Sequence, residues 1–334
     1  MNASSSLSEH LAQFAGKPVA LFDAGAPFDF SAKVPRLALD WEAHVDGLGM
    51  AELMAELVRR PHSNDLEGLV FGVWDFIGSV NSSAVVKSLV DARERFAGLR
   101  SLFIGDIVEV EQEVGWIAHG DVTPLLAAFP ALQELRIRGS AGLSFGRDGE
   151  RVGHARLESL TIESAGLSRD VVVAILEGEF PKLRHLELWL GSEAHGSTAS
   201  LDDFGPLFAG ERFPSLESLA IKNAETADVL ATAIAQAPIL ARLKKLDLSL
   251  GTLSDAGAEL LAESPAVRQL HDLDLRKSFL SPEMVKRLHG LTPVIVDVRG
   301  TRFGKEEEAR PSTVPPRRKP IELPLARLRN ARSR

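Results

Sequence analysis

The sequence predicts an α/β solenoid, a stack of strand–turn–helix units that follow one another along the chain, and three observations support this prediction. An apolar residue recurs at relative positions 1, 4 and 6 of eight short stretches. These stretches and two weaker upstream copies begin 21 to 33 residues apart, which is room for one strand and one helix. Between the stretches the apolar spacing changes from two residues to about 3.6, the helical period. The ten copies begin at Val34, Leu66, Leu99, Leu132, Leu157, Leu183, Leu216, Leu243, Leu270 and Leu291.

Each stretch has the pattern of a strand with one buried face. Alternate side chains of a strand face opposite sides, so positions 4 and 6 point into a core and positions 3, 5 and 7 point outward. One such strand cannot bury its apolar face, whereas stacked copies can, provided that returning helices cover them. We therefore expect a horseshoe with a parallel β-sheet on its concave face and helices on its convex face. The core residues expected from the strongest copies are Leu102, Ile104, Leu135, Ile137, Leu160, Ile162, Leu186, Leu188, Leu219, Ile221, Leu246, Leu248, Leu273 and Leu275.

Helical periodicity and capping residues place helices between the strands. Serine precedes several of the helical segments, and a serine hydroxyl is a favoured N-cap. Ser281 is followed by proline at the first helical position, which is a strong start signal. The expected helices cover residues 49–59, 82–96, 168–176, 226–237, 254–262 and 281–288.

The chain divides into three regions. Residues 1–33 precede the repeats and are expected to cap the first apolar face, with a short helix over 7–14 and a short strand over 19–22. Residues 34–303 form the repeat domain, with about ten repeats. Residues 304–334 are rich in proline and charge, and we expect a disordered basic tail. From Arg310 onward this tail holds eight basic residues and one acid, whereas the preceding residues hold 30 basic and 45 acidic side chains.

Two resemblances follow from these motifs. The run from Leu243 to Ala262 (LKKLDLSLGTLSDAGAELLA) resembles a unit of ribonuclease-inhibitor-like leucine-rich repeats. The stretch 34–300 resembles a family of bacterial cytoplasmic leucine-rich-repeat (LRR) proteins with no assigned biochemical role, through GWIAHGDVTPLL at 115–126 and HLELWLG at 185–191. The resemblance implies a leucine-rich-repeat horseshoe and protein binding, and no catalytic activity carries over. Position 9, where such repeats place asparagine or cysteine, holds neither residue in this chain.

Composition narrows the classes of function. Cysteine is absent, which excludes disulfides and thiol chemistry and fits a cytoplasmic location. No apolar run approaches the ~18 residues of a membrane span, and the N-terminal residues lack the pattern of a secretory signal. The excess of acids before the tail would repel nucleic-acid phosphates, so nucleic acid is an unlikely partner except through the basic tail.

No catalytic residue, cofactor or metal ligand is predicted, because phosphate-binding glycine loops, paired-histidine motifs and serine nucleophile elbows are all absent from the sequence. The alternative is an enzyme or metal-dependent site within 106–121, where oxygen ligands are frequent. Valines alternate with the acids there, so the same residues fit a half-buried strand with a solvated acidic face. The residues concerned are Asp106, Glu109, Glu111, Glu113, His119 and Asp121.

The outward face of the strands is the predicted binding surface, and the predicted function is non-catalytic binding of another protein. Trp189 is the expected anchor, because tryptophan and arginine are enriched among binding hot spots; its alternative role is packing beneath the loop 191–201. The predicted partner-binding residues are Arg136, Arg138, His185, Glu187, Trp189, Lys222, Lys245, Asp247, Asp272, Asp274 and Arg276. Three further tryptophans, just after strands, are expected at one rim: Trp41, Trp74 and Trp116.

Overall fold

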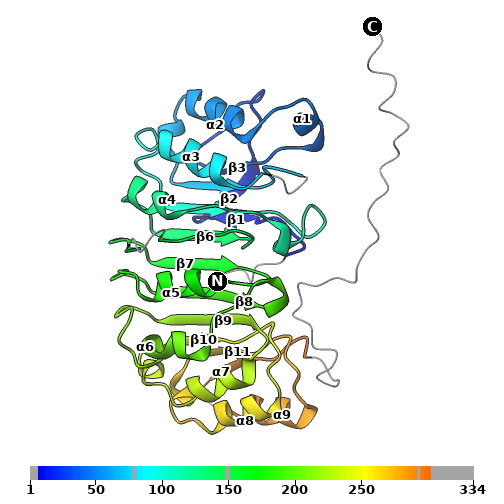
Figure 1. The fold of residues 1–334 in the computed structure, drawn as a ribbon, viewed down its shortest axis with the longest axis vertical. Helices are drawn as coiled ribbons and strands as arrows, with labels where there is room; N and C mark the ends of the chain where they lie inside the picture. Colours follow the sequence, from blue (N-terminus) through cyan, green and yellow to red (C-terminus); the bar gives the residue numbers. More distant parts are fainter. Residues whose placement is uncertain (1–6, 77–79, 147–150, 292–293, 302–334) are drawn as a thin grey trace, which may run out of the picture.

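The computed structural model describes residues 7–76, 80–146, 151–291 and 294–301, and within these ranges twelve strands form one sheet (Figure 1). The order of the strands in the sheet is their order in the chain, and every neighbouring pair is parallel except β1 with β2. The strands are β1 Gln13–Phe14, β2 Lys17–Leu21, β3 Val34–Leu37, β4 Gly68–Phe71, β5 Ser101–Ile104, β6 Glu134–Arg138, β7 Ser159–Glu163, β8 His185–Gly191, β9 Ser218–Ala224, β10 Lys245–Asp247, β11 Asp272–Asp274 and β12 Ile295–Asp297.

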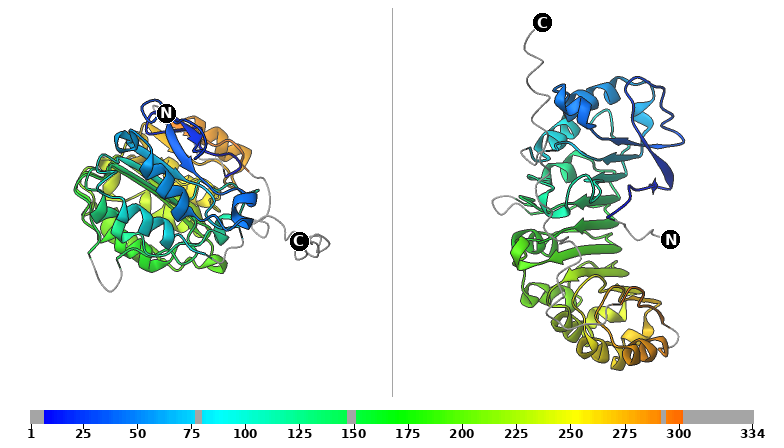
Figure 2. Two further views of the ribbon diagram at one scale, coloured as in Figure 1. Left: turned by 90° about the horizontal axis from the view of Figure 1, so that it is seen from above. Right: turned by 90° about the vertical axis from the view of Figure 1, so that its right-hand side faces the viewer.

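Helices cover one side of this sheet. In the right-hand view of Figure 2 they lie opposite the dark-blue N-terminal segment, and the yellow and orange C-terminal repeats bend toward that segment's side. No helix in the described ranges is long and apolar enough to cross a bilayer. The α-helices are α1 Trp41–Val45, α2 Met50–Arg59, α3 Ser83–Asp91, α4 Thr123–Ala128, α5 Arg169–Leu176, α6 Gly205–Phe208, α7 Ala227–Ile234, α8 Asp255–Glu263 and α9 Pro282–His289.

The core lies between the sheet and these helices, as the apolar pattern predicts. The fourteen expected inward residues are confirmed, since none exposes more than 2% of its surface. They belong to one apolar cluster that runs from Phe22 to Val298. The helices expected within the repeats are present, with ends shifted by a few residues. Ser168 and Ser281 cap α5 and α9, where their side chains accept hydrogen bonds from backbone N–H groups.

The first and last repeats differ from the predicted register by two residues. Leu37 pairs with Phe71, which occupies position 6 of its repeat, so the first copy begins two residues earlier than expected. Val296 pairs with Leu273, which occupies position 4, so the last copy begins two residues later. A shift of two keeps each side chain on its face. The pattern of apolar residues therefore did not reveal the error.

The turns after the strands reveal the correct register. Asn223, Leu250, Lys277 and Gly300 all occupy position 8 once the last copy is shifted, and all have φ between +54° and +71°. This left-handed conformation is easy for glycine, tolerated by asparagine and unfavourable for leucine and lysine. The four C-terminal repeats thus share a left-handed residue at position 8. They make their turns in this way without the asparagine that typical repeats carry at position 9.

The N-terminal region departs from its predicted helix. Residues 13–21 form a hairpin, β1 and β2, whose two turn residues Ala15 and Gly16 have φ of 50° and 73°. Such a two-residue turn with positive φ matches the twist of paired strands. The strand predicted over 19–22 is confirmed within β2. The predicted tail, from 304 onward, lies outside the described residues.

Candidate functional site

The candidate site is the face of the sheet turned away from the helices, which we call the polar face. Its side chains occupy positions 3, 5 and 7 of β6 to β11 and the residues that directly follow β10 to β12. The register places equivalent side chains on adjacent strands, so that Arg136 lies beside Thr161, then Glu187, Ala220, Asp247 and Asp274. Parallel strands lie about 4.8 Å apart, and neighbouring charges on this ladder therefore interact directly.

At its N-terminal end this face of the sheet is covered by the chain itself. Phe14 packs with Val34, Val70 and Phe103 in a small apolar cluster outside the main core. Asp106 secures the covering segment, because its Oδ1 accepts a hydrogen bond from the Leu11 backbone N–H at 3.2 Å. The open surface consequently begins at β6.

Asp106 is itself held by a buried ion pair. Its Oδ2 lies 2.8 Å from Arg36 Nε, and its backbone oxygen accepts a second bond from Arg36 Nη2 at 2.8 Å. The imidazole of His10 lies 3.1 Å from the same guanidinium and 3.3 Å from a Glu111 carboxylate oxygen. These contacts join the N-terminal segment to β3 and to the loop after β5.

Two arginines and one glutamate form a buried charge cluster at the start of the open surface. Glu163 is fully buried, and its two oxygens accept hydrogen bonds from Arg136 Nε at 2.7 Å and Arg138 Nε at 2.6 Å. Both guanidinium groups lie over the Phe103 ring, at 4.4 and 5.5 Å from its centroid. Burial alone raises the pKa of Glu163, but the two arginines hold that pKa below its usual value.

A second charge cluster surrounds Trp189. The indole N–H donates to Glu187 Oε1 at 2.6 Å, and Lys222 Nζ lies 5.0 Å above the ring. The same ammonium lies 3.2 Å from Glu187 and 3.4 Å from Asp247. Burial alone raises the pKa of Glu187, but Lys222, His185 and the Trp189 N–H together hold it far below its usual value. Burial also raises the pKa of Asp247, with repulsion from Asp274 adding to the effect despite the nearby lysine.

The structure corrects the expected exposure of three predicted binding residues. Trp189 is 1% exposed, and Arg138 and Lys222 are buried as well. All three occupy position 7. Arg138 Nη1 donates to the Ile107 carbonyl of the loop after β5 at 3.0 Å, whereas Trp189 and Lys222 pack against each other. The predicted exposure of these three side chains is therefore wrong, although Lys222 still contributes to the lining of the hollow described below.

The other predicted residues of the polar face are partly or fully accessible. His185 hydrogen-bonds Ser218 Oγ on the next strand at 3.0 Å. Lys245 is exposed and pairs with Asp272 across one repeat at 2.7 Å. Arg276 Nε lies 2.8 Å from Asp274 Oδ2 and 3.4 Å from Asp297 Oδ2. Ion pairs between neighbouring strands thus hold these side chains in position.

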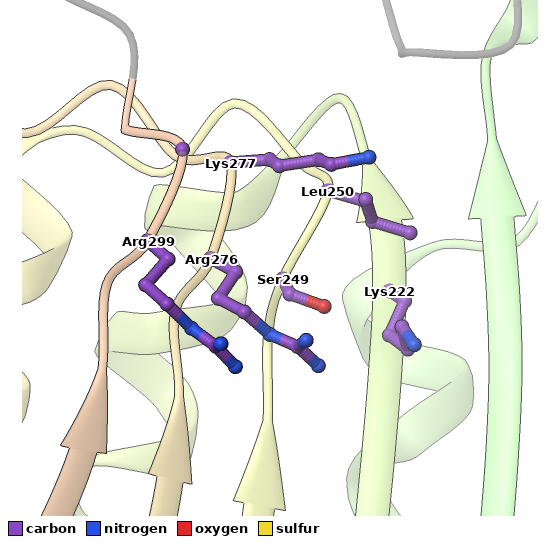
Figure 3. A pocket seen from close by; sticks show the side chains of 7 residues that line it. Lys222, Ser249, Leu250, Arg276, Lys277 and Arg299 are labelled. Atoms are coloured by element: carbon purple, nitrogen blue, oxygen red, sulfur yellow. The ribbon is translucent and has the colours of Figure 1, made fainter. Parts of the chain in front are cut away.

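A hollow of about 330 Å³ opens where strands β9 to β12 end (Figure 3). The lining cations are Lys222, Arg276, Lys277 and Arg299. Arg299 is absent from the predicted site because the last repeat begins two residues later than predicted. Lys277 is absent because it occupies position 8, and only positions 3, 5 and 7 were expected to face outward. In the register of the structure Lys222, Arg276 and Arg299 share position 7. The recurrence of a cation at this position is the feature of the sequence that could have indicated the hollow.

The predicted tryptophan rim is only partly formed. Trp41 is 50% exposed and packs edge-on against Phe76, with ring centroids 5.7 Å apart. Trp74 is buried against His119, with centroids 5.4 Å apart. Trp116, in a 3₁₀ turn, is 68% exposed. Trp41 and Trp116 are therefore accessible, whereas Trp74 belongs to the interior and is corrected as a rim residue.

The acidic segment 106–121 is not the half-buried strand that its alternating valines indicate, because Val108 and Val114 are buried while Val110 is 90% exposed in a turn. Asp106 pairs with Arg36, and Asp121 Oδ1 accepts from the Thr123 backbone N–H at 3.0 Å. Within the described ranges no three histidine, aspartate or glutamate side chains are grouped to hold a metal ion.

Parallel strands in chain order, with apolar residues at positions 1, 4 and 6 of the eight repeats that contain β4 to β11, define an α/β protein of the leucine-rich-repeat type. No protein-family model and no curated protein matches the chain. The fold is similar to the crystal structure of a structural-genomics protein from Bacteroides fragilis, with a TM-score of 0.75 and 32% identity over 80% of this chain and 75% of that chain. The chain belongs to the same family as this Bacteroides protein.

An internalin from Listeria monocytogenes is a more distant structural match. It has a TM-score of 0.36 and 14% identity over 82% of this chain and 75% of that chain. At this distance the similarity carries no argument about fold or function.

Proposed function

We propose that the chain is a non-catalytic, cytoplasmic scaffold that binds another protein on the polar face, which lies on the concave side of a leucine-rich-repeat horseshoe. The observation that supports this is the set of ion pairs between consecutive strands, such as Lys245–Asp272 and Lys222–Glu187. Side chains held in this way lose little conformational freedom on association, which favours binding. The fixed arrangement of positive and negative charges across the strands favours a partner with a complementary order of charges.

The mutations that test this proposal are placed on the accessible part of the polar face. Lys245 and Asp272 both reach solvent and pair across one repeat. Exchanging them (Lys245→Asp with Asp272→Lys) keeps an ion pair within the protein but inverts the order of charges that a partner meets. The matched control exchanges Arg287 and Glu259 (Arg287→Glu with Glu259→Arg), an ion pair between α8 and α9 on the helical side.

Affinity capture from the native cell extract, followed by mass spectrometry, identifies the partner, and titration calorimetry measures its Kd for each variant. We expect the exchange on the polar face to weaken binding at least tenfold. The control exchange should change the Kd by less than twofold. Equal affinities for both variants would contradict a binding surface on the polar face.

A further inference from the structure

The hollow at the ends of β9 to β12 collects positive charge from successive repeats. Lys222, Arg276 and Arg299 come from position 7 of three repeats, and Lys277 follows Arg276 in the chain. Figure 3 shows the side chains of Arg276 and Arg299 extending side by side, with Lys277 crossing the upper edge of the hollow toward Leu250. No carboxylate is among the lining residues.

Acidic residues lie deeper on the strands and neutralise part of this charge. Asp274 and Asp297 pair with the Nε atoms of Arg276 and Arg299, at 2.8 and 2.9 Å. Asp247 lies 3.4 Å from Lys222 Nζ. For Lys277, by contrast, no carboxylate within the described ranges lies at ion-pair distance. The ammonium at the edge of the hollow thus brings a positive charge that no carboxylate of the described residues balances.

The backbone at Lys277 is the second observation. Its φ of 56° is a conformation in which a lysine is strained and a glycine is not. The equivalent residue of the next repeat is Gly300, and a Cβ there would lie 3.3 Å from Lys277 Cγ. A lysine at position 277 therefore costs stability, and the glycine beside it leaves room for its stem. The same conformation occurs at Asn223 and Leu250, so it belongs to the turn of these repeats, and it directs the Lys277 side chain across the edge of the hollow.

The size of the hollow and the charges around it indicate which kind of ligand it would bind. The hollow accommodates a single small group, and arginine side by side with arginine suits the two oxygens of a carboxylate. Asp274 and Asp297 lie beside it on β11 and β12, so an extended polyanion such as a nucleic acid would be repelled. Resting on the proposed function, we propose that this hollow binds a carboxylate side chain of the partner protein, with Lys277 and Arg299 as its contacts.

The probe for this proposal is a Gly-Glu-Gly peptide with acetylated and amidated ends, which offers one carboxylate, and it is compared with the same peptide carrying glutamine in place of glutamate. Each peptide is titrated at low salt into the full chain, which is deuterated and ¹⁵N-labelled. The chemical shifts of the backbone amides are recorded at each step. With the glutamate peptide we expect shifts concentrated at residues 249–250, 276–277 and 299–300, and none of comparable size with the glutamine peptide. Shifts no larger in the hollow than around the exposed Lys182 or Lys286 would overturn the proposal.

Two substitutions separate binding from folding. Lys277→Gln should weaken the glutamate peptide at least fivefold, whereas Lys286→Gln, the same change on exposed α9, should have less than a twofold effect. Lys277→Gly should weaken it as much as Lys277→Gln without lowering the Tm, because glycine suits the left-handed backbone. Equal losses for Lys277→Gln and Lys286→Gln would refute a site at this lysine.

The captured partner distinguishes this inference from the proposed function. If the Lys277 variants leave the partner's Kd unchanged while the Lys245–Asp272 exchange weakens it, the scaffold stands and the carboxylate site is refuted. If that exchange has no effect and the peptide shifts are still centred on the hollow, the polar-face scaffold is refuted and the carboxylate site stands.

Discussion

Glu163→Gln tests whether the buried charge cluster at β6 and β7 holds the polar face together. The substitution keeps the shape of the side chain but removes the charge that Arg136 and Arg138 share. Two guanidinium groups would then lose, inside a buried site, the carboxylate that they share. Removing one member of a buried ion pair costs roughly 3–5 kcal/mol, so we expect the free energy of unfolding to fall by about that amount.

Urea unfolding at pH 7 measures this loss, with Glu217→Gln as the control. Glu217 also serves two cations, Arg184 and Lys244, but at the surface, where solvent screens the pairing. Its midpoint should move by only a small fraction of the shift seen for Glu163→Gln. Equal shifts in the two variants would show that burial does not strengthen the inner cluster.

The pH dependence supplies an independent check. The folded protein holds the pKa of Glu163 below its usual value, so the carboxylate contributes stability above the unfolded pKa of about 4.3. That contribution disappears as the pH falls through the folded pKa. The stability difference between wild type and Glu163→Gln should therefore be largest near neutral pH and shrink in acid. If the difference were the same at every pH, the conclusion that Glu163 is a charged carboxylate at neutral pH would be wrong.

The other predictions concern stability at three places. Trp189→Ala should lower the free energy of unfolding by about 3–5 kcal/mol in urea titrations, because the side chain is buried, whereas Trp41→Ala at the surface should cost far less. Burial lowers the pKa of His119 to about 4, so the contribution of this side chain to stability should fall by about 2 kcal/mol between pH 7 and pH 5. His119→Gln should reduce the slope of the urea midpoints by that amount, and His154, whose pKa burial also lowers, should account for part of what remains. Asp106→Asn should release the covering segment 7–15, detected as faster amide hydrogen exchange there with little change at β8 to β10; unchanged exchange would show that Phe14 alone holds the segment.

The repeat architecture could be predicted because its signal is local and recurs. Leucine or isoleucine at positions 4 and 6 can be buried only if each strand pairs with the next, and the same requirement repeats in every unit. Serine caps such as Ser281 mark helix starts by their own chemistry. The copies at the two ends were misplaced by two residues, since a shift of two leaves every side chain on the same face.

The candidate site depended on contacts that the repeat pattern does not contain. Alternation placed Trp189 and Lys222 on the outward face correctly, but their burial depends on contacts across strands, with each other, with Glu187 and with Asp247. The covering of β3 to β5 by residues 7–15 likewise joins Leu11 to Asp106, which are 95 residues apart. The apolar period within the chain determined which face of each strand meets the core. Only the tertiary structure decided which outward side chains remain open, because that depends on long-range packing between loops and strands.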